Sequence, residues 1–262
     1  MLDERWIRSL HVEAMRHADL HAEREPHVLF QASTIGALLD GAFEGDVTFA
    51  ELAERGNLGL GTLNHLDGEM VALEGEFYRA DVNGSISEVG PGERTPFAVV
   101  VPFRPTLEFD LEGSVGFDAL LSEVDRRLPE NAPSCALRID GRFELVRARS
   151  VPRQDPPYRP LTEVVAEQHV FELERLDGTI VGFRFPEFAE GIEVSGWHLH
   201  FLSEDRSRGG HVLDCRAETA HFGVDPSSEL HVELPPGIDL DDREAALATH
   251  EAIERVERER SA

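Results

Sequence analysis

Apolar residues at helical spacing predict two of the longer helices in the chain. One is an amphipathic helix over residues 3–24, and the other covers residues 117–128. A charged segment at residues 241–260 predicts a further helix near the C-terminal end. The apolar face of the first helix is formed by Trp6, Leu10 and Met15 or Leu20.

Two short helices are predicted from their N-terminal caps. Ser33 or Thr34 can cap a helix that ends near Asp40, because a hydroxyl oxygen accepts a hydrogen bond from a first-turn backbone N–H group. Thr48-Phe49-Ala50-Glu51 has the spacing of a capping box, and the helix that it opens should end near Gly56.

Strand-like runs follow, and Asp-Gly or Glu-Gly pairs separate them as expected for tight turns. The expected strands are residues 58–63, 69–73 and 76–78, divided by Asp67-Gly68 and Glu74-Gly75, then the apolar run 98–103, and residues 134–151, which we expect to form two strands around a turn at Asp140-Gly141.

Three histidines near residue 200 carry the clearest chemical signal. His198 and His200 alternate on an expected strand and therefore share one face. The polar loop 203–210 can fold the chain back so that His211 starts the return strand beside them. Three imidazoles leave a coordination position open, as in catalytic zinc sites, but they also suit iron, copper, nickel and manganese. The plainer interpretation, polar residues on a solvated face, stays open.

A repeated pattern indicates two related halves. Thr48-Phe49-Ala50-Glu51-Leu52 precedes an expected turn at Leu66-Asp67-Gly68, and Pro160-Leu161-Thr162-Glu163-Val164 precedes an expected turn at Leu176-Asp177-Gly178. A duplicated unit explains this, although any helix followed by a hairpin does so too. We expect an α/β (α+β) fold of two similar sub-domains, each a mixed β-sheet with flanking helices, with the histidine hairpin in the second. The expected parts are an N-terminal helix (1–26), an N-terminal α/β domain (27–155) and a C-terminal α/β domain with the hairpin and tail helix (156–262).

Composition excludes several classes of function. The formal net charge of −26 argues against nucleic acid and anionic membranes as partners. All 25 basic residues are arginine, so a Schiff-base lysine or a pyridoxal phosphate attachment is excluded. No nucleotide-binding glycine motif and no apolar run long enough for a membrane span occur. The charged N-terminus lacks a signal-peptide pattern, which predicts a cytoplasmic protein, and Cys135 and Cys215 form no metal-spaced motif.

Several long ordered stretches of the chain match one known family. They are Gln31-Ala32-Ser33-Thr34-Ile35-Gly36-Ala37-Leu38-Leu39-Asp40-Gly41, Gly59-Leu60-Gly61-Thr62-Leu63-Asn64-His65-Leu66-Asp67-Gly68-Glu69-Met70, Arg138-Ile139-Asp140-Gly141 with Arg147-Ala148-Arg149, and Gly196-Trp197-His198-Leu199-His200-Phe201 through Gly209-Gly210-His211-Val212-Leu213-Asp214. With these stretches the chain resembles the alpha-acetolactate decarboxylases. The resemblance implies conversion of 2-acetolactate, a small 2-hydroxy-3-keto acid, to acetoin and carbon dioxide, with a zinc ion and a two-domain α/β fold that tends to form a homodimer.

The family's functional positions transfer residue by residue. The resemblance implies that the zinc ligands are His198, His200 and His211. It further implies an active-site arginine at Arg149, a glutamate at Glu69, a threonine at Thr62, and a tail glutamate at Glu257, for which Glu254 is a close competitor.

The chemistry of the reaction agrees with this set of residues. Loss of carbon dioxide leaves an electron pair that must flow into the neighbouring ketone, so an electron sink is needed. A Lewis-acidic metal chelated by the ketone and hydroxyl oxygens supplies one. Arg149 can bind the carboxylate with two parallel hydrogen bonds. Glu69 and Glu257 can hold the hydroxyl or protonate carbon, and Thr62 can shape the pocket.

Two rival functions remain at this stage. His198-x-His200-x-x-x-Glu204 imitates a cupin motif with Glu204 as a fourth ligand, although the expected helices do not suit an all-β cupin. The other rival is a non-catalytic module that binds a small ligand.

Overall fold

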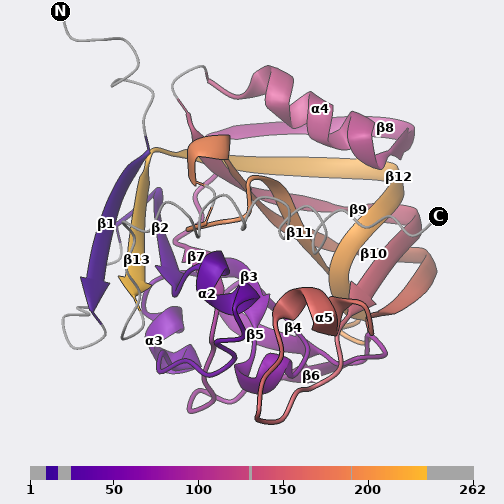
Figure 1. Cartoon of the computed structure of the whole chain (residues 1–262). Helices are drawn as coiled ribbons and strands as arrows, with labels where there is room; N and C mark the ends of the chain where they lie inside the picture. The colour runs from indigo at the N-terminus through magenta and orange to yellow at the C-terminus, as the bar shows by residue number, and fades with distance from the viewer. Residues whose placement is uncertain (1–9, 17–24, 130–131, 190, 235–262) are drawn as a thin grey trace, which may run out of the picture.

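The structure is a computed structural model, and it describes residues 10–16, 25–129, 132–189 and 191–234. Over these ranges the chain has a mixed α+β fold that is dominated by two β-sheets with few helices, in agreement with the predicted class (Figure 1). None of the helices in these ranges is both long and apolar enough to span a bilayer.

The first sheet has eight strands within the described ranges and is mixed. The pairs β1–β13 and β13–β2 are parallel. The remaining neighbours, β2–β7, β7–β3, β3–β4, β4–β5 and β5–β6, pair antiparallel. In spatial order the strands are β1 (His11–Arg16), β13 (Glu229–Leu234), β2 (Val28–Ala32), β7 (Ala98–Val101), β3 (Leu58–Thr62), β4 (Glu69–Leu73), β5 (Glu76–Ala80) and β6 (Ile86–Glu88).

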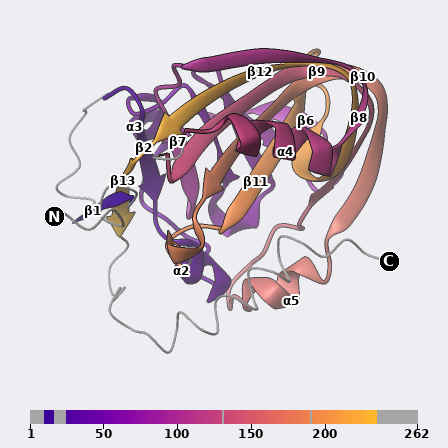
Figure 2. The ribbon, with the colours of Figure 1, turned by 90° about the horizontal axis from the view of Figure 1, so that it is seen from above.

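The second sheet has five strands in the described part of the chain, all antiparallel. Three of them are long and curve together, as Figure 2 shows from above. The short strand β11 also pairs with β12, so β11 lies beside both β10 and β12. In spatial order the strands are β11 (Gly196–Ser203), β10 (His169–Phe185), β9 (Ser134–Ser150), β12 (Gly209–Ser227) and β8 (Leu107–Gly116).

The helices are short and their caps agree with the sequence. Thr34 Oγ1 accepts a hydrogen bond from Ala37 N at 3.2 Å at the start of α2 (Ile35–Leu39). The predicted capping box opens α3 (Phe49–Ala53), where the Glu51 carboxylate accepts a hydrogen bond from Thr48 N at 2.8 Å. The predicted helix 117–128 is α4 (Phe117–Arg127), and a further short helix, α5, spans Leu161–Val165.

The predicted N-terminal helix is wrong where it can be compared. Residues His11–Arg16 form strand β1, which pairs along its whole length with β13. Helical spacing of apolar residues was outweighed here by the backbone hydrogen bonds that a sheet edge offers. The remaining residues of that prediction, 3–9 and 17–24, lie outside the described residues, as does the predicted tail helix at 241–260.

Two predicted Asp-Gly turns are also wrong. Asp140-Gly141 lies inside β9 and Asp177-Gly178 inside β10, so the second copy of the apparent repeat has no hairpin there. The two pairs face each other, with Gly141 opposite Gly178 in the register. A Cβ on Gly141 would lie 2.1 Å from the Thr219 carbonyl oxygen, and one on Gly178 would lie 2.5 Å from the Phe201 ring. These glycines therefore serve close packing, and no turn is needed.

The boundary between the two sheets does not follow a division of the chain at residue 155. Strands β8 and β9 precede that residue and belong to the second sheet, while β13 follows it and completes the first sheet. The predicted domain boundaries thus remain a prediction. Apolar side chains from both sheets meet between them, including Leu60 and Val99 from the first sheet and Val181 and Phe183 from the second. A separate core lies between the second sheet and α4.

Candidate active site

Alternation along β11 places two histidines between the sheets. Trp197, Leu199 and Phe201 point into the core beneath α4. His198 and His200 therefore point the opposite way, toward the first sheet, where the His200 ring reaches the Met70 carbonyl oxygen of β4 at 2.8 Å. The predicted face of the strand is confirmed, and it is buried.

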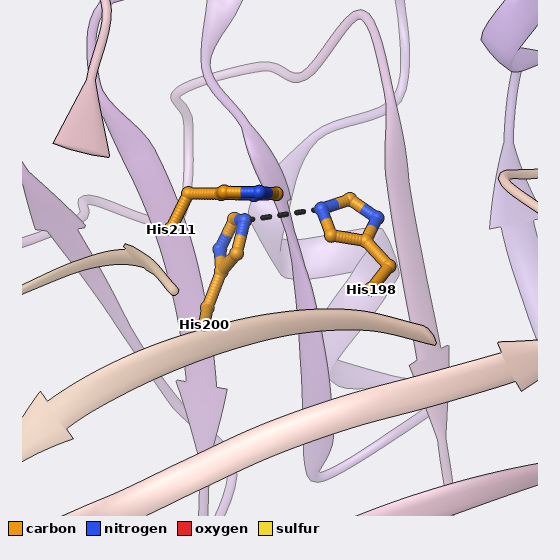
Figure 3. A group of neighbouring side chains, drawn as sticks. All are labelled: His198, His200 and His211. Atoms are coloured by element: carbon orange, nitrogen blue, oxygen red, sulfur yellow. Dashed lines mark hydrogen bonds between the residues drawn. The ribbon is translucent and has the colours of Figure 1, made fainter. Parts of the chain in front are cut away.

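The predicted hairpin brings the third histidine to the same point. β11 and β12 pair antiparallel with His200 directly opposite His211. The three rings converge with centroid distances of 5.0, 5.1 and 5.3 Å (Figure 3). Each offers a nitrogen, and these nitrogens all lie within 4.8 Å of one another, close enough to hold one metal ion. Glu204 is exposed in the turn and is not part of this group, which removes the cupin-like fourth ligand.

Burial keeps the three imidazoles neutral, the form that binds metals. It lowers the pKa of His198 to about 3, with the positive charge of Arg149 as the next cause. Burial is also the largest cause that lowers the pKa values of His200 and His211 well below the usual range, and Arg149 acts on both in the same direction.

The protonation of these rings fits a metal site. Because the Met70 carbonyl can only accept, His200 Nδ1 carries the proton and Nε2 keeps its lone pair. His200 Nε2 lies 3.2 Å from His198 Nε2. Two nitrogens bound to one tetrahedral zinc ion lie roughly 3.3 Å apart, given Zn–N bonds of 2.0–2.1 Å. The donor set and its spacing therefore suit a divalent transition metal.

Three other predicted residues surround the histidines. Arg149 is only 3% exposed, lies on β9 and pairs in register with His211. Glu69, on β4, places its Oε2 atom 3.5 Å from His200 Nε2. Thr62 lies opposite Glu69 in the β3–β4 register, and its hydroxyl donates to the Gly68 carbonyl at 2.8 Å. Thr62 thereby fixes the turn that leads into Glu69.

A pocket connects these groups and has two unlike sides. It encloses about 450 Å³, its open mouth included. One side is polar and consists of Thr62, Glu69, Arg149, His198 and His211. The other side is apolar and consists of Ile35, Leu38, Leu66, Phe97, Val151, Leu161 and Val165, with the backbone of Gly61.

Comparison with known proteins settles the family. The sequence model of the alpha-acetolactate decarboxylases matches residues 29–246. The chain belongs to the alpha-acetolactate decarboxylase family.

Two members of the family illustrate the extent of the likeness. An alpha-acetolactate decarboxylase of Methylococcus capsulatus is 42% identical over 233 residues, which are 89% of this chain and 90% of that protein. The crystal structure of alpha-acetolactate decarboxylase from Bacillus subtilis strain 168 superposes with a TM-score of 0.82 at 36% identity, covering 88% of this chain and 99% of that chain.

Six of the residues named from the sequence lie together in the histidine cluster and on the polar side of the pocket, whereas the apolar side was not predicted. His198, His200, His211, Arg149, Glu69 and Thr62 come together as described above. Glu257 and its competitor Glu254 lie outside the described residues. The apolar side, built largely by α2 and α5, was not singled out. Its signal, apolar residues at helical spacing, is the same for an ordinary core.

Proposed function

We propose that this protein decarboxylates 2-acetolactate to acetoin and carbon dioxide, using a divalent metal held by His198, His200 and His211. The observation that carries the proposal is a cluster of three buried histidines, two of which line one pocket with Arg149 and Glu69, in a chain that belongs to this family. When bound, the metal supplies Lewis acidity where negative charge develops on the substrate's ketone.

Arg149 is suited to hold the substrate carboxylate. Its guanidinium is always charged, and burial removes competing water, so two parallel hydrogen bonds to a carboxylate become strong. The bond between the carbinol carbon and the carboxylate breaks when carbon dioxide leaves. The electron pair moves toward the ketone and forms an enediolate.

Glu69 is suited to deliver the proton that replaces carbon dioxide. In the ionised form its Oε2 atom accepts a hydrogen bond from the substrate hydroxyl, which keeps its own proton. After Glu69 takes up a proton from solvent, it donates that proton to the carbon that lost carbon dioxide. Thr62 supports this role by holding the preceding turn through Gly68.

The test of the proposal combines metal content with product formation. We expect the purified protein to contain about one equivalent of a divalent transition metal per chain, with zinc as the proposed ion. It should form acetoin from racemic 2-acetolactate. Active protein with well under half an equivalent of metal would overturn the metal proposal. Metal-loaded protein without acetoin formation would favour a binding module, the remaining rival.

Glu257 is proposed as a second acid–base residue on the basis of the family resemblance alone. Glu257→Gln should slow turnover about a hundredfold, within the range that a positioned acid–base group supplies. Metal content should not change. Glu254→Gln is the matched control and should have little effect. If Glu254→Gln is the damaging change instead, then the tail glutamate is Glu254. If neither variant is slow, the tail contributes no such residue.

The resemblance also supports a homodimer as the assembled form. Sedimentation velocity of the purified full chain measures this, and a monomer at micromolar concentration would contradict it.

A further inference from the structure

Four of the seven apolar residues that line the pocket come from two short helices, α2 and α5, which contact each other. Ile35 and Leu38 come from α2, and Leu161 and Val165 come from α5. All four are buried and belong to one apolar cluster. In sequence these helices are more than 120 residues apart, so their meeting over the pocket is a product of the fold.

Helical spacing is compatible with each pair of lining residues pointing to the same side of its helix. Ile35 and Leu38 are three residues apart, and Leu161 and Val165 are four apart, so each pair lies on one face of its helix. Their neighbours Leu39 and Val164 belong to the same cluster but are not among the residues that line the pocket. Leu38 and Leu39 are each 5% exposed, while Val165 and Val164 are 2% and 0% exposed.

The two sides of the pocket divide the substrate by polarity. A 2-hydroxy-3-keto acid has its carboxylate, hydroxyl and ketone oxygens as polar groups, and these match Arg149, Glu69 and the histidines. Its alkyl groups have no such partner, and a buried apolar surface is the environment that favours them. The alkyl groups must then face the apolar side of the pocket, to which α2 and α5 contribute.

We propose that Leu38 of α2 and Val165 of α5 determine which alkyl substituents the enzyme accepts. The inference rests on the proposed function. The side chains of Leu38 and Val165 limit the length of the alkyl group that fits, because packed interiors leave little room for an added methylene. The site therefore accepts 2-alkyl-2-hydroxy-3-ketobutyrates with short alkyl groups. The two helices determine the largest alkyl group that is accepted.

The experiment compares matched pairs of variants in the full-length, metal-loaded protein. Leu38→Ala is paired with Leu39→Ala, and Val165→Ala with Val164→Ala. For each, kcat/KM is measured with the 2-methyl, 2-ethyl and 2-propyl substrates. We expect Leu38→Ala and Val165→Ala to raise the propyl-to-methyl ratio about tenfold or more, since one methylene in an apolar pocket changes specificity by about 10–200-fold. The two control variants should leave the ratio within about twofold.

A binding measurement separates this inference from the proposed function. Calorimetry with the unreactive 2,3-dihydroxy-2-alkylbutanoates reports the same size preference without turnover. If the wild-type protein binds the series but forms no acetoin, the proposed reaction fails while the size limit can still be read from the four variants. If the preference is unchanged in both pocket variants, or changes equally in the controls, the inference is wrong. Leu38→Val replaces Leu38→Ala should the latter fail to fold by circular dichroism.

Discussion

Replacing His200 with alanine should remove the metal from the protein and abolish decarboxylation. His200 is fully buried, and its Nδ1 atom donates to the Met70 carbonyl, which orients Nε2 toward the other two histidines. Changing only a group that supports a ligand already costs about 10–100-fold in metal affinity or activity, and losing the ligand itself should cost more than about a hundredfold. Elemental analysis and acetoin formation measure both effects.

A matched control shows whether the effect is specific to the histidine cluster. His231 also lies on a strand, β13, but outside the pocket. His231→Ala should leave metal content and kcat near those of the unmodified protein. Circular dichroism of His200→Ala checks that the fold persists. A folded His200→Ala protein with normal metal content and rate would show that the cluster is not the site.

Arg149→Lys should fail to restore the activity that Arg149→Ala removes. A lysine ammonium keeps the charge but cannot form two parallel hydrogen bonds to one carboxylate. Arg149→Ala removes both charge-assisted hydrogen bonds. At about 1.5–3 kcal/mol each, their loss should lower kcat/KM by at least about a hundredfold. Steady-state kinetics on 2-acetolactate measures the loss.

Two further measurements test the role of Arg149. Metal content should be retained in both variants, because an arginine is not expected to be a ligand. Arg147→Lys is the control, since Arg147 lies on the same strand, is half-buried and does not line the pocket. Near-normal turnover by Arg149→Lys would exclude the paired hydrogen bonds while leaving the family assignment intact.

Predictions from short stretches of sequence were confirmed where the structure depends on residues close together in the chain. Thr34 and Thr48 cap helices because each hydroxyl accepts a hydrogen bond from the backbone N–H group three residues further along the chain. The alternation of His198 and His200 survives because strand geometry alone puts them on one face. The same holds for the hairpins that join β3 to β4 and β4 to β5.

Predictions were wrong where the structure depends on contacts between segments that are far apart in the sequence. Asp140-Gly141 and Asp177-Gly178 have turn composition, but they pair with each other across β9 and β10. Thr179 Oγ1 donates to Asp140 Oδ1 at 2.7 Å, and Arg142 pairs with Asp177 at 3.2 Å. A pattern in neighbouring residues does not predict such cross-strand partners. The apolar side of the pocket was missed for a related reason, since a side chain that lines a cavity and one that fills a core look alike in sequence.

The position of β13 has a consequence for how the protein is made. This strand lies between β1 and β2, the first two strands of the described residues, and begins only at Glu229. A ribosome has therefore synthesised all three histidines and the whole second sheet before β1 can find its partner. Pairing across such a separation is slow, because a long loop must close before any contact repays it. A nascent chain that stops short of Glu229 would expose the edge of β2, which makes early termination a route to aggregation.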